Sequence, residues 1–199
     1  FPDRDKKFVK EFQTTFNSSF WEIYLFAFFR KIGAKFDFNH QSPDFSLELS
    51  GEKIVVEAAI AAAASGKTPE WERPLSGMAP NRVKKMNIES IIRLSNAICT
   101  KYKKYKNEYS SLPHLKSKPF ILAIAPFEQP HFNLQYDGPI TALLYDQYTD
   151  EDASFDDPEK YPEGMAPVIN LGTVEKDNGA EIELGFFNDP RFSEISAVI

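Results

Sequence analysis

Two acidic residues in the first half of the chain, Asp44 and Glu57, are candidates for a catalytic or metal-binding site. Glu57 is the only charged residue of the run 54–60, whose other members are isoleucine, valine and alanine. Asp44 precedes it and follows Pro43 directly. A buried carboxylate costs several kcal/mol unless it is paired or binds a metal. We therefore interpret the two acids as ligands of one hard divalent cation, Mg²⁺ or Mn²⁺, because such ions take oxygen ligands.

The turn between the two acids predicts how they face each other. If Gly51 and Glu52 form a two-residue turn, Asp44 lies opposite Ala59 in a β-hairpin. Side chains of a strand alternate between its two faces. Asp44 and Glu57 then share one face as diagonal neighbours, about 7–8 Å apart.

Each acid also has a simpler explanation. An ion pair with a lysine would satisfy a buried Glu57 without any metal. Ser42-Pro43-Asp44 is common turn chemistry. These alternatives stay open at the level of sequence.

The elements that must position the acids follow an α/β order. Residues 19–31 begin with a capping box, Ser19-x-x-Glu22, and are apolar all round, which predicts a buried helix. The expected elements are a helix within 1–17, a helix at 19–31, strands at 35–38, 44–49 and 53–60, a loop at 65–81, a helix at 82–106 and a buried strand at 120–125.

The second half of the chain is less regular. Residues 146–163 hold eight acidic residues and one lysine, which predicts a solvated loop. Asn178-Gly179 lies between apolar alternations and predicts a β-hairpin.

This arrangement resembles the PD-(D/E)XK nuclease superfamily. Its pattern is a helix with an acid, Pro-Asp at a strand start, (Asp/Glu)-x-Lys on the next strand, then a helix and a strand. Pro43-Asp44 and Glu57-Ala58-Ala59 match the two motifs, and Glu22 matches the helix acid. The resemblance covers about residues 18–126. It implies a restriction-endonuclease-like α/β fold, a mixed central sheet flanked by helices, here with an added C-terminal β-hairpin region.

The resemblance also implies roles for these residues. Asp44 and Glu57 would hold Mg²⁺ (or Mn²⁺), the backbone carbonyl of Ala58 would complete the shell, and Glu22 would be a further ligand. The implied activity is phosphodiester hydrolysis. The capping box explains Glu22 equally well without a metal.

The chain departs from the family pattern at Ala59, where the family has its catalytic lysine. Some family members supply this lysine from the following helix. Lys101 is our first candidate and Lys104, which shares its helix face, is the second. The small side chains of Ala58 and Ala59 would leave room for a long side chain. The alternative is that both lysines are ordinary surface residues.

The helix expected at 82–106 is strongly basic, with eight basic residues and one acid. Such a helix suits contact with nucleic-acid phosphates, and two interleaved tyrosines, Tyr102 and Tyr105, would stack on bases. The other interpretations are a solvated helix face, or a helix covered by the acidic segment 146–163. The residues assigned to nucleic-acid binding are Arg82, Lys84, Lys85, Arg93 and Lys103.

Composition limits the other classes of function. The 199 residues predict one domain, with a core at about 18–126 and a peripheral elaboration at 127–199. A formal net charge of −6 excludes a uniformly basic nucleic-acid coat. One cysteine forms no internal disulfide, so we expect a cytoplasmic protein, and no apolar run approaches the roughly 20 residues of a membrane span. A homo-oligomer is compatible with the sequence.

Two functions follow from these observations. The first is a metal-dependent endonuclease that cleaves DNA or RNA. The second is a catalytically inactive protein of nuclease fold, acting as a nucleic-acid-binding or protein-interaction module, with Ala59 as the mark of lost chemistry. A third possibility is a structural protein whose buried acids only pair with lysines.

Overall fold

The computed structural model describes residues 8–40, 42–64, 66–73 and 83–199. Two compact units share the chain. Unit 1 comprises Phe1–Ile60, Ala97–Ala125 and Glu194–Ile199, and unit 2 comprises Ala61–Asn96 and Pro126–Ser193. The interpretation of the chain as one domain stays a prediction.

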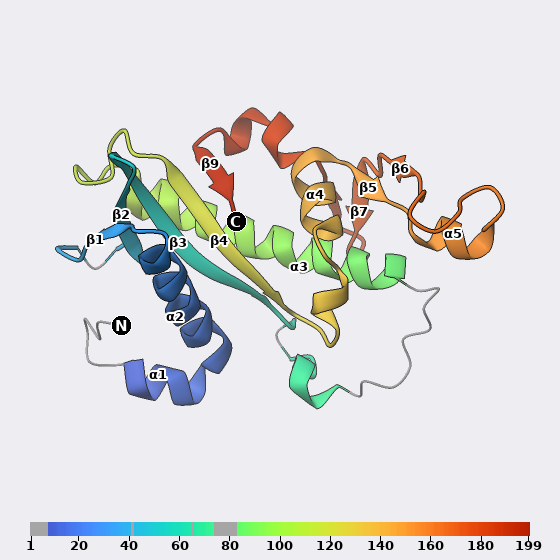
Figure 1. The fold of residues 1–199 in the computed structure, drawn as a ribbon, viewed down its shortest axis with the longest axis horizontal. Helices are drawn as coiled ribbons and strands as arrows, with labels where there is room; N and C mark the ends of the chain where they lie inside the picture. Colours follow the sequence, from blue (N-terminus) through green and yellow to red (C-terminus); the bar gives the residue numbers. More distant parts are fainter. Residues whose placement is uncertain (1–7, 41, 65, 74–82) are drawn as a thin grey trace. The chain divides into compact units, whose positions relative to one another are not determined.

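The centre of unit 1 is a five-stranded mixed sheet (Figure 1). Its strand order is β1-β2-β3-β4-β9, with β1–β2 and β2–β3 antiparallel and β4–β9 parallel. The bounds are β1 Lys35–Asp37, β2 Phe45–Leu49, β3 Glu52–Ala62, β4 Phe120–Phe127 and β9 Ile195–Val198. The mixed α/β sheet is as expected. The contribution of β9 was not anticipated, because the sequence analysis treated the C-terminal residues as peripheral.

One face of this sheet is covered by α2 (Phe16–Lys31), which follows the short helix α1 (Phe8–Thr14). Leu25 and Phe29 of α2 pack with Phe45, Val56 and other apolar residues of the strands. Strand side chains alternate, so the residues between these positions, Glu57 among them, point to the other face.

Two expectations about α2 are wrong. The helix begins at Phe16, and no side chain caps its N-terminus, so Ser19 lies inside the helix and does not open it. The helix is also not buried all round, because Phe16, Phe20, Tyr24 and Phe28 are exposed. The composition of the helix could not show which of its sides is exposed, because a row of aromatic residues has the same sequence pattern whether it packs against the core or faces solvent.

The β2–β3 hairpin turns one residue earlier than expected. Leu49 pairs with Glu52, so the turn residues are Ser50 and Gly51, both with positive φ as a tight type I′ hairpin requires. Asp44 therefore comes level with Glu57, not with Ala59. The pairing has moved by two residues, an even number, so both acids keep the shared face that the sequence predicted.

The other face of the sheet carries α3 (Val83–Lys104), which passes behind β3 and β4 in Figure 1. Only its last part, from Ala97, belongs to unit 1. The helix continues into a π-helical turn, Tyr105–Tyr109. The expected helix at 82–106 and the expected buried strand at 120–125 are both present. Their ends in the described part of the structure differ from the expected ends by at most two residues.

Unit 2 contains short elements. Its hairpin, β7 paired with β8, confirms the turn expected at Asn178-Gly179. The acidic segment expected as a loop contains β5, which pairs with β6, and the short helix α5. The bounds are α4 Gly138–Tyr145, β5 Tyr148–Thr149, α5 Asp152–Asp156, β6 Val168–Ile169, β7 Thr173–Glu175 and β8 Glu181–Glu183, with 3₁₀ turns at Glu70–Glu72, Phe132–Leu134, Phe186–Asn188 and Pro190–Phe192. Among the described residues, no helix is both long and apolar enough to cross a membrane.

Candidate functional site

Glu57 is the centre of the candidate site in unit 1. Its β3 neighbours Val55 and Val56 are fully buried, and Glu57 itself is only 1% exposed. β3 is the middle strand of the sheet, and its pairing with β2 ends at Val56, directly before Glu57. A carboxylate at this depth needs partners, because water does not solvate it there.

Two lysines of α3 are partners of one of the two carboxylate oxygens of Glu57. The Lys101 Nζ donates to Glu57 Oε1 at 2.8 Å, and the Lys104 Nζ donates to the same oxygen at 3.2 Å. The two lysines are one helical turn apart and so share a helix face. The structure therefore brings together the buried acid and both lysines that the sequence analysis named.

The second carboxylate oxygen of Glu57, Oε2, is not bound by either lysine. Among the described residues, Oε2 has no hydrogen-bond partner, although it is buried. A buried acceptor without a donor costs about 1–3 kcal/mol. Both ammonium groups are on the other oxygen, so Oε2 is free to accept a further positive ligand.

Asp44 lies immediately before β2, level with Glu57. The Ala58 backbone N–H donates to Asp44 Oδ2 at 2.8 Å, which ties the acid to β3. Burial, together with the negative charge of Glu57, raises the pKa of Asp44 to about 6, although Lys101 and the Ala58 hydrogen bond act in the opposite direction. A carboxyl group whose pKa is raised by a neighbouring carboxylate is a common feature of functional sites.

This raised pKa predicts a pH dependence of stability. The pKa of Asp44 rises from 3.8 to about 6, so the folded protein holds the proton more tightly than the unfolded chain. The resulting stability is complete below the unfolded pKa and is lost as the pH rises through about 6. Between about pH 4 and pH 7.5, metal-free protein should lose up to about 3 kcal/mol of unfolding free energy more than an Asp44→Asn variant.

Urea unfolding in EDTA at several pH values measures this difference. Asparagine keeps an oxygen that accepts the Ala58 N–H, so the variant isolates the titration from the hydrogen bond. Identical pH dependence in the two proteins would show that the pKa of Asp44 is not raised.

Lys104 has a second contact that the sequence did not signal. Its Nζ lies 5.0 Å from the ring centre of Tyr109, a buried residue of the π-helical turn. Burial lowers the pKa of Lys104, but a hydrogen bond with Tyr109 and the charge of Glu57 outweigh it and raise the pKa above its ordinary value. Lys104 is therefore held as a cation, between the carboxylate and the ring.

Two histidines that are distant in the sequence form a pair beside the site, which the sequence did not predict. The rings of His40 and His114 stack with their centres 3.7 Å apart. The His114 Nε2 lies 3.1 Å from the backbone carbonyl oxygen of Ser42, two residues before Asp44. His114 thus supports the segment that positions Asp44. His40 itself lies two residues before Ser42 in the sequence.

Glu22 lies on α2, in line with the buried Ser19 and Phe29, while α3 and its lysines are on the opposite face of the sheet. Among the described residues, no group of three or more histidine, cysteine, aspartate or glutamate side chains could hold a metal ion. The structure does bring Asp44 level with Glu57 and bonds Asp44 to the backbone of Ala58.

The basic residues of α3 do not form one open face. Arg93 donates to the carbonyl oxygens of Ala62 and Ala63, at 2.7 and 3.3 Å. In unit 2, the Lys84 Nζ donates to Asp150 at 3.2 Å, so one lysine of the first turn of the helix is paired with the acidic segment. Lys85 and Lys103 are exposed and Arg82 lies outside the described residues.

The interleaved tyrosines are engaged as well. Tyr102 is buried and its hydroxyl donates to Glu194, so the expectation that it stacks on bases is wrong. Tyr105 stacks on Phe120, with the ring centres 4.1 Å apart. Neither ring is presented to a nucleic acid in this structure.

We compared the chain with models of known protein families, with curated proteins and with solved structures, and none of them matches.

Proposed function

We propose that the protein is a metal-dependent nuclease that hydrolyses phosphodiester bonds of DNA or RNA with Mg²⁺ or Mn²⁺. The observation that carries the proposal is the buried Oε2 of Glu57, which lacks a partner beside Asp44 while two lysines bind Oε1. Carboxylate oxygens are the ligands that Mg²⁺ prefers, and the ion would relieve both the orphaned oxygen and the repulsion between the acids.

The order of the elements supports the same proposal. A helix, three antiparallel strands, a second helix and a further strand of one sheet follow each other along unit 1. This is the order expected for a restriction-endonuclease-like fold, with Asp44 at the start of the second strand and Glu57 in the third. We propose that fold for unit 1, with the lysine displaced from position 59 to α3.

A divalent ion at this site would polarise a phosphate oxygen and lower the pKa of nearby water. Asp44 and Glu57 would hold the ion from one face of the sheet. Lys101, which makes the shorter contact with Glu57, would orient the attacking water and stabilise the negative charge that develops on the phosphate. Lys104, the more exposed of the two lysines, would bind a phosphate oxygen.

A metal titration tests the proposal directly. Mg²⁺ or Mn²⁺ should raise the Tm of the protein, because a ligand that binds only the folded state stabilises it. The rise should be larger at about pH 7.5 than at about pH 5, because the ion must displace the proton of Asp44. The same protein should cut plasmid DNA or a structured RNA with either ion, and EDTA should stop the reaction.

An Asp44→Asn variant is the control for the melting experiment, because it loses one charge of the site and keeps the Ala58 hydrogen bond. Its Tm should respond much less to either ion. If the wild-type Tm is unchanged by Mg²⁺, Mn²⁺ and Ca²⁺, and no cleavage occurs, the proposal fails.

A catalytically inactive, nucleic-acid-binding or protein-interaction module is the second candidate. Ala59 and the pairing of both lysines with Glu57 favour it, because that pairing already neutralises the buried charge. This candidate predicts salt-sensitive binding of nucleic acid that is independent of metal. Gel-shift titrations with and without EDTA, at two salt concentrations, distinguish the two candidates.

A further inference from the structure

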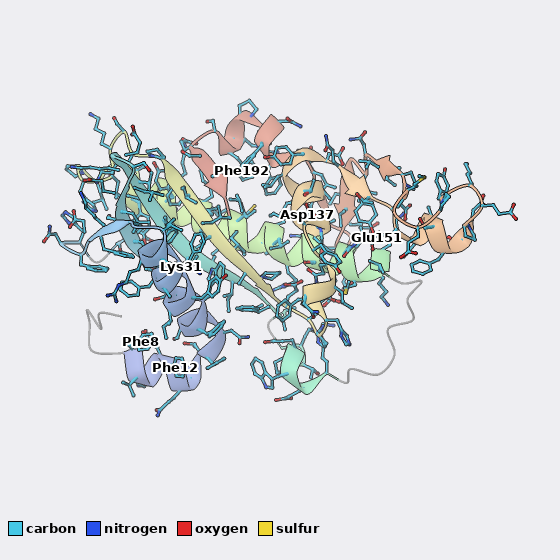
Figure 2. All side chains as sticks on the ribbon, viewed as in Figure 1. Phe8, Phe12, Lys31, Asp137, Glu151 and Phe192 are labelled. Atoms are coloured by element: carbon cyan, nitrogen blue, oxygen red, sulfur yellow. The ribbon has the colours of Figure 1, made fainter. Side chains whose placement is uncertain are left out.

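The exposed side of α2 carries a continuous row of large apolar side chains. Every fourth position is apolar, and the members are exposed by 43–53%: Phe16, Phe20, Tyr24, Phe28 and, just past the end of the helix, Ile32. Residues four apart form one ridge along a helix surface. Ring contacts extend this ridge onto α1, through Phe12 and Phe8 (Figure 2).

The rings of the row are held in place by the fold. Tyr24 stacks on Trp21, with the ring centres 5.4 Å apart, and the Trp21 Nε1 donates to the backbone carbonyl oxygen of Ala123 in β4 at 2.9 Å. Phe16 stacks on Phe20 in the same way. Rigid aromatic side chains lose little conformational entropy on binding, which is why they dominate protein interfaces.

We propose that this row is the interface of a symmetric homodimer, in which α2 of one copy crosses α2 of another. A ridge of this kind packs into the groove beside an equal ridge at an interaxial angle of about −50°. A two-fold axis brings the same patch of both copies together, so one self-complementary ridge suffices. Tyr24, the middle member, would lie nearest the axis.

The area of the row agrees with such a dimer. A half-exposed aromatic side chain offers about 100 Å², so the five residues offer about 500 Å² in each copy. Two copies would bury about 1,000 Å², which lies at the lower limit for a specific interface. We therefore expect a reversible dimer with a Kd of roughly 1–100 µM.

The charges at the two ends of α2 are also compatible with this packing. Arg30 and Lys31 lie in the last turn, and Figure 2 shows Lys31 at the end away from α1. No acidic or basic side chain interrupts the row itself. An antiparallel crossing keeps the basic ends of the two helices apart and aligns the helix dipoles favourably.

Sedimentation velocity of the full chain, over about 2–200 µM, tests the proposal. The wild type should shift from monomer to dimer across this range. Tyr24→Lys should stay monomeric, because a charge at the axis would face its own copy. Tyr136→Lys, the same change at an exposed tyrosine outside the row, should behave as the wild type.

A cross-linking experiment covers the case that Tyr24→Lys does not fold. In a Cys99→Ser background, Tyr24→Cys should form a disulfide-linked dimer on mild oxidation, and Tyr136→Cys should not. A wild type that is monomeric throughout the range, or equal cross-linking of both variants, would overturn the proposal. Binding of the monomer to phosphatidylcholine vesicles, lost in Tyr24→Lys, would overturn it in favour of a lipid-binding face.

Discussion

Replacing Glu57 with glutamine should lower metal-dependent cleavage by at least about 100-fold, because the ion contributes several kcal/mol to the barrier and each 1.4 kcal/mol is about tenfold in rate. The variant removes one charge from a side chain that is 1% exposed and keeps its size. The rise of Tm with Mg²⁺ or Mn²⁺ should disappear together with cleavage. Glu57→Ala should have the same effect on activity.

The fold should survive this change. Breaking a buried ion pair costs most when a charge is left in the interior. Here the remaining charges are on Lys101 and Lys104, whose side chains are 27% and 40% exposed and can reach water. Far-UV circular dichroism and a melting curve without metal check this point.

Glu128→Gln is a matched control, because Glu128 is as deeply buried as Glu57 but lies in unit 2, outside the proposed site. It should keep cleavage and the response to metal. Wild-type cleavage rates in Glu57→Gln would refute the assignment of the site, whatever the stability of the variant.

Replacing Lys101 with methionine should reduce the rate of cleavage by roughly 100-fold and leave the binding of metal intact, because removing one group that stabilises the charge developing in the transition state costs about 10²–10³-fold. The Lys101 Nζ is 2.8 Å from the oxygen of Glu57, nearer than the Lys104 Nζ at 3.2 Å. Methionine has the length of the lysine stem without its charge. Loss of a positive charge beside Asp44 and Glu57 should, if anything, strengthen the binding of a cation.

Lys103→Met is the control for this variant. Lys103 lies on the same helix and is exposed. Because it is assigned only to binding of the nucleic acid, its replacement should change the rate at saturating substrate by less than about twofold. Lys104→Met should weaken the binding of substrate more than the rate at saturation. Equal activities of the Lys101→Met and Lys103→Met variants would show that α3 does not supply the missing lysine.

The candidate site was predictable to a large extent because a charge inside an apolar strand is a strong local signal. Glu57 stands out in its run, and the buried environment in the structure agrees with that signal. The shared face of Asp44 and Glu57 was also predictable, because an even change in register preserves it. The register of the hairpin was not predictable. The sequence suggested Gly51 and Glu52 as the two turn residues, but Ser50 adopts positive φ and forms the turn together with Gly51.

Other features depended on contacts between distant segments. Helix periodicity was enough to select Lys101 and Lys104 among the basic residues of α3. It could not show that Arg93 binds a backbone carbonyl and Lys84 a carboxylate, because both partners are distant in sequence. Tyr102 looked like a residue for stacking and is buried against Glu194. Such pairings are set by which surfaces meet, and sequence spacing does not encode them.

The amino-acid order alone was enough to indicate an α/β chain with a carboxylate inside a strand, because hydrophobic period and turn chemistry act over a few residues. Which lysine reaches that carboxylate, which oxygen stays without a donor, and which side of α2 remains exposed were settled by the packing of α2 and α3 on opposite faces of one sheet. These properties arise when segments far apart in the chain come into contact, since burial and pairing belong to surfaces and not to single residues.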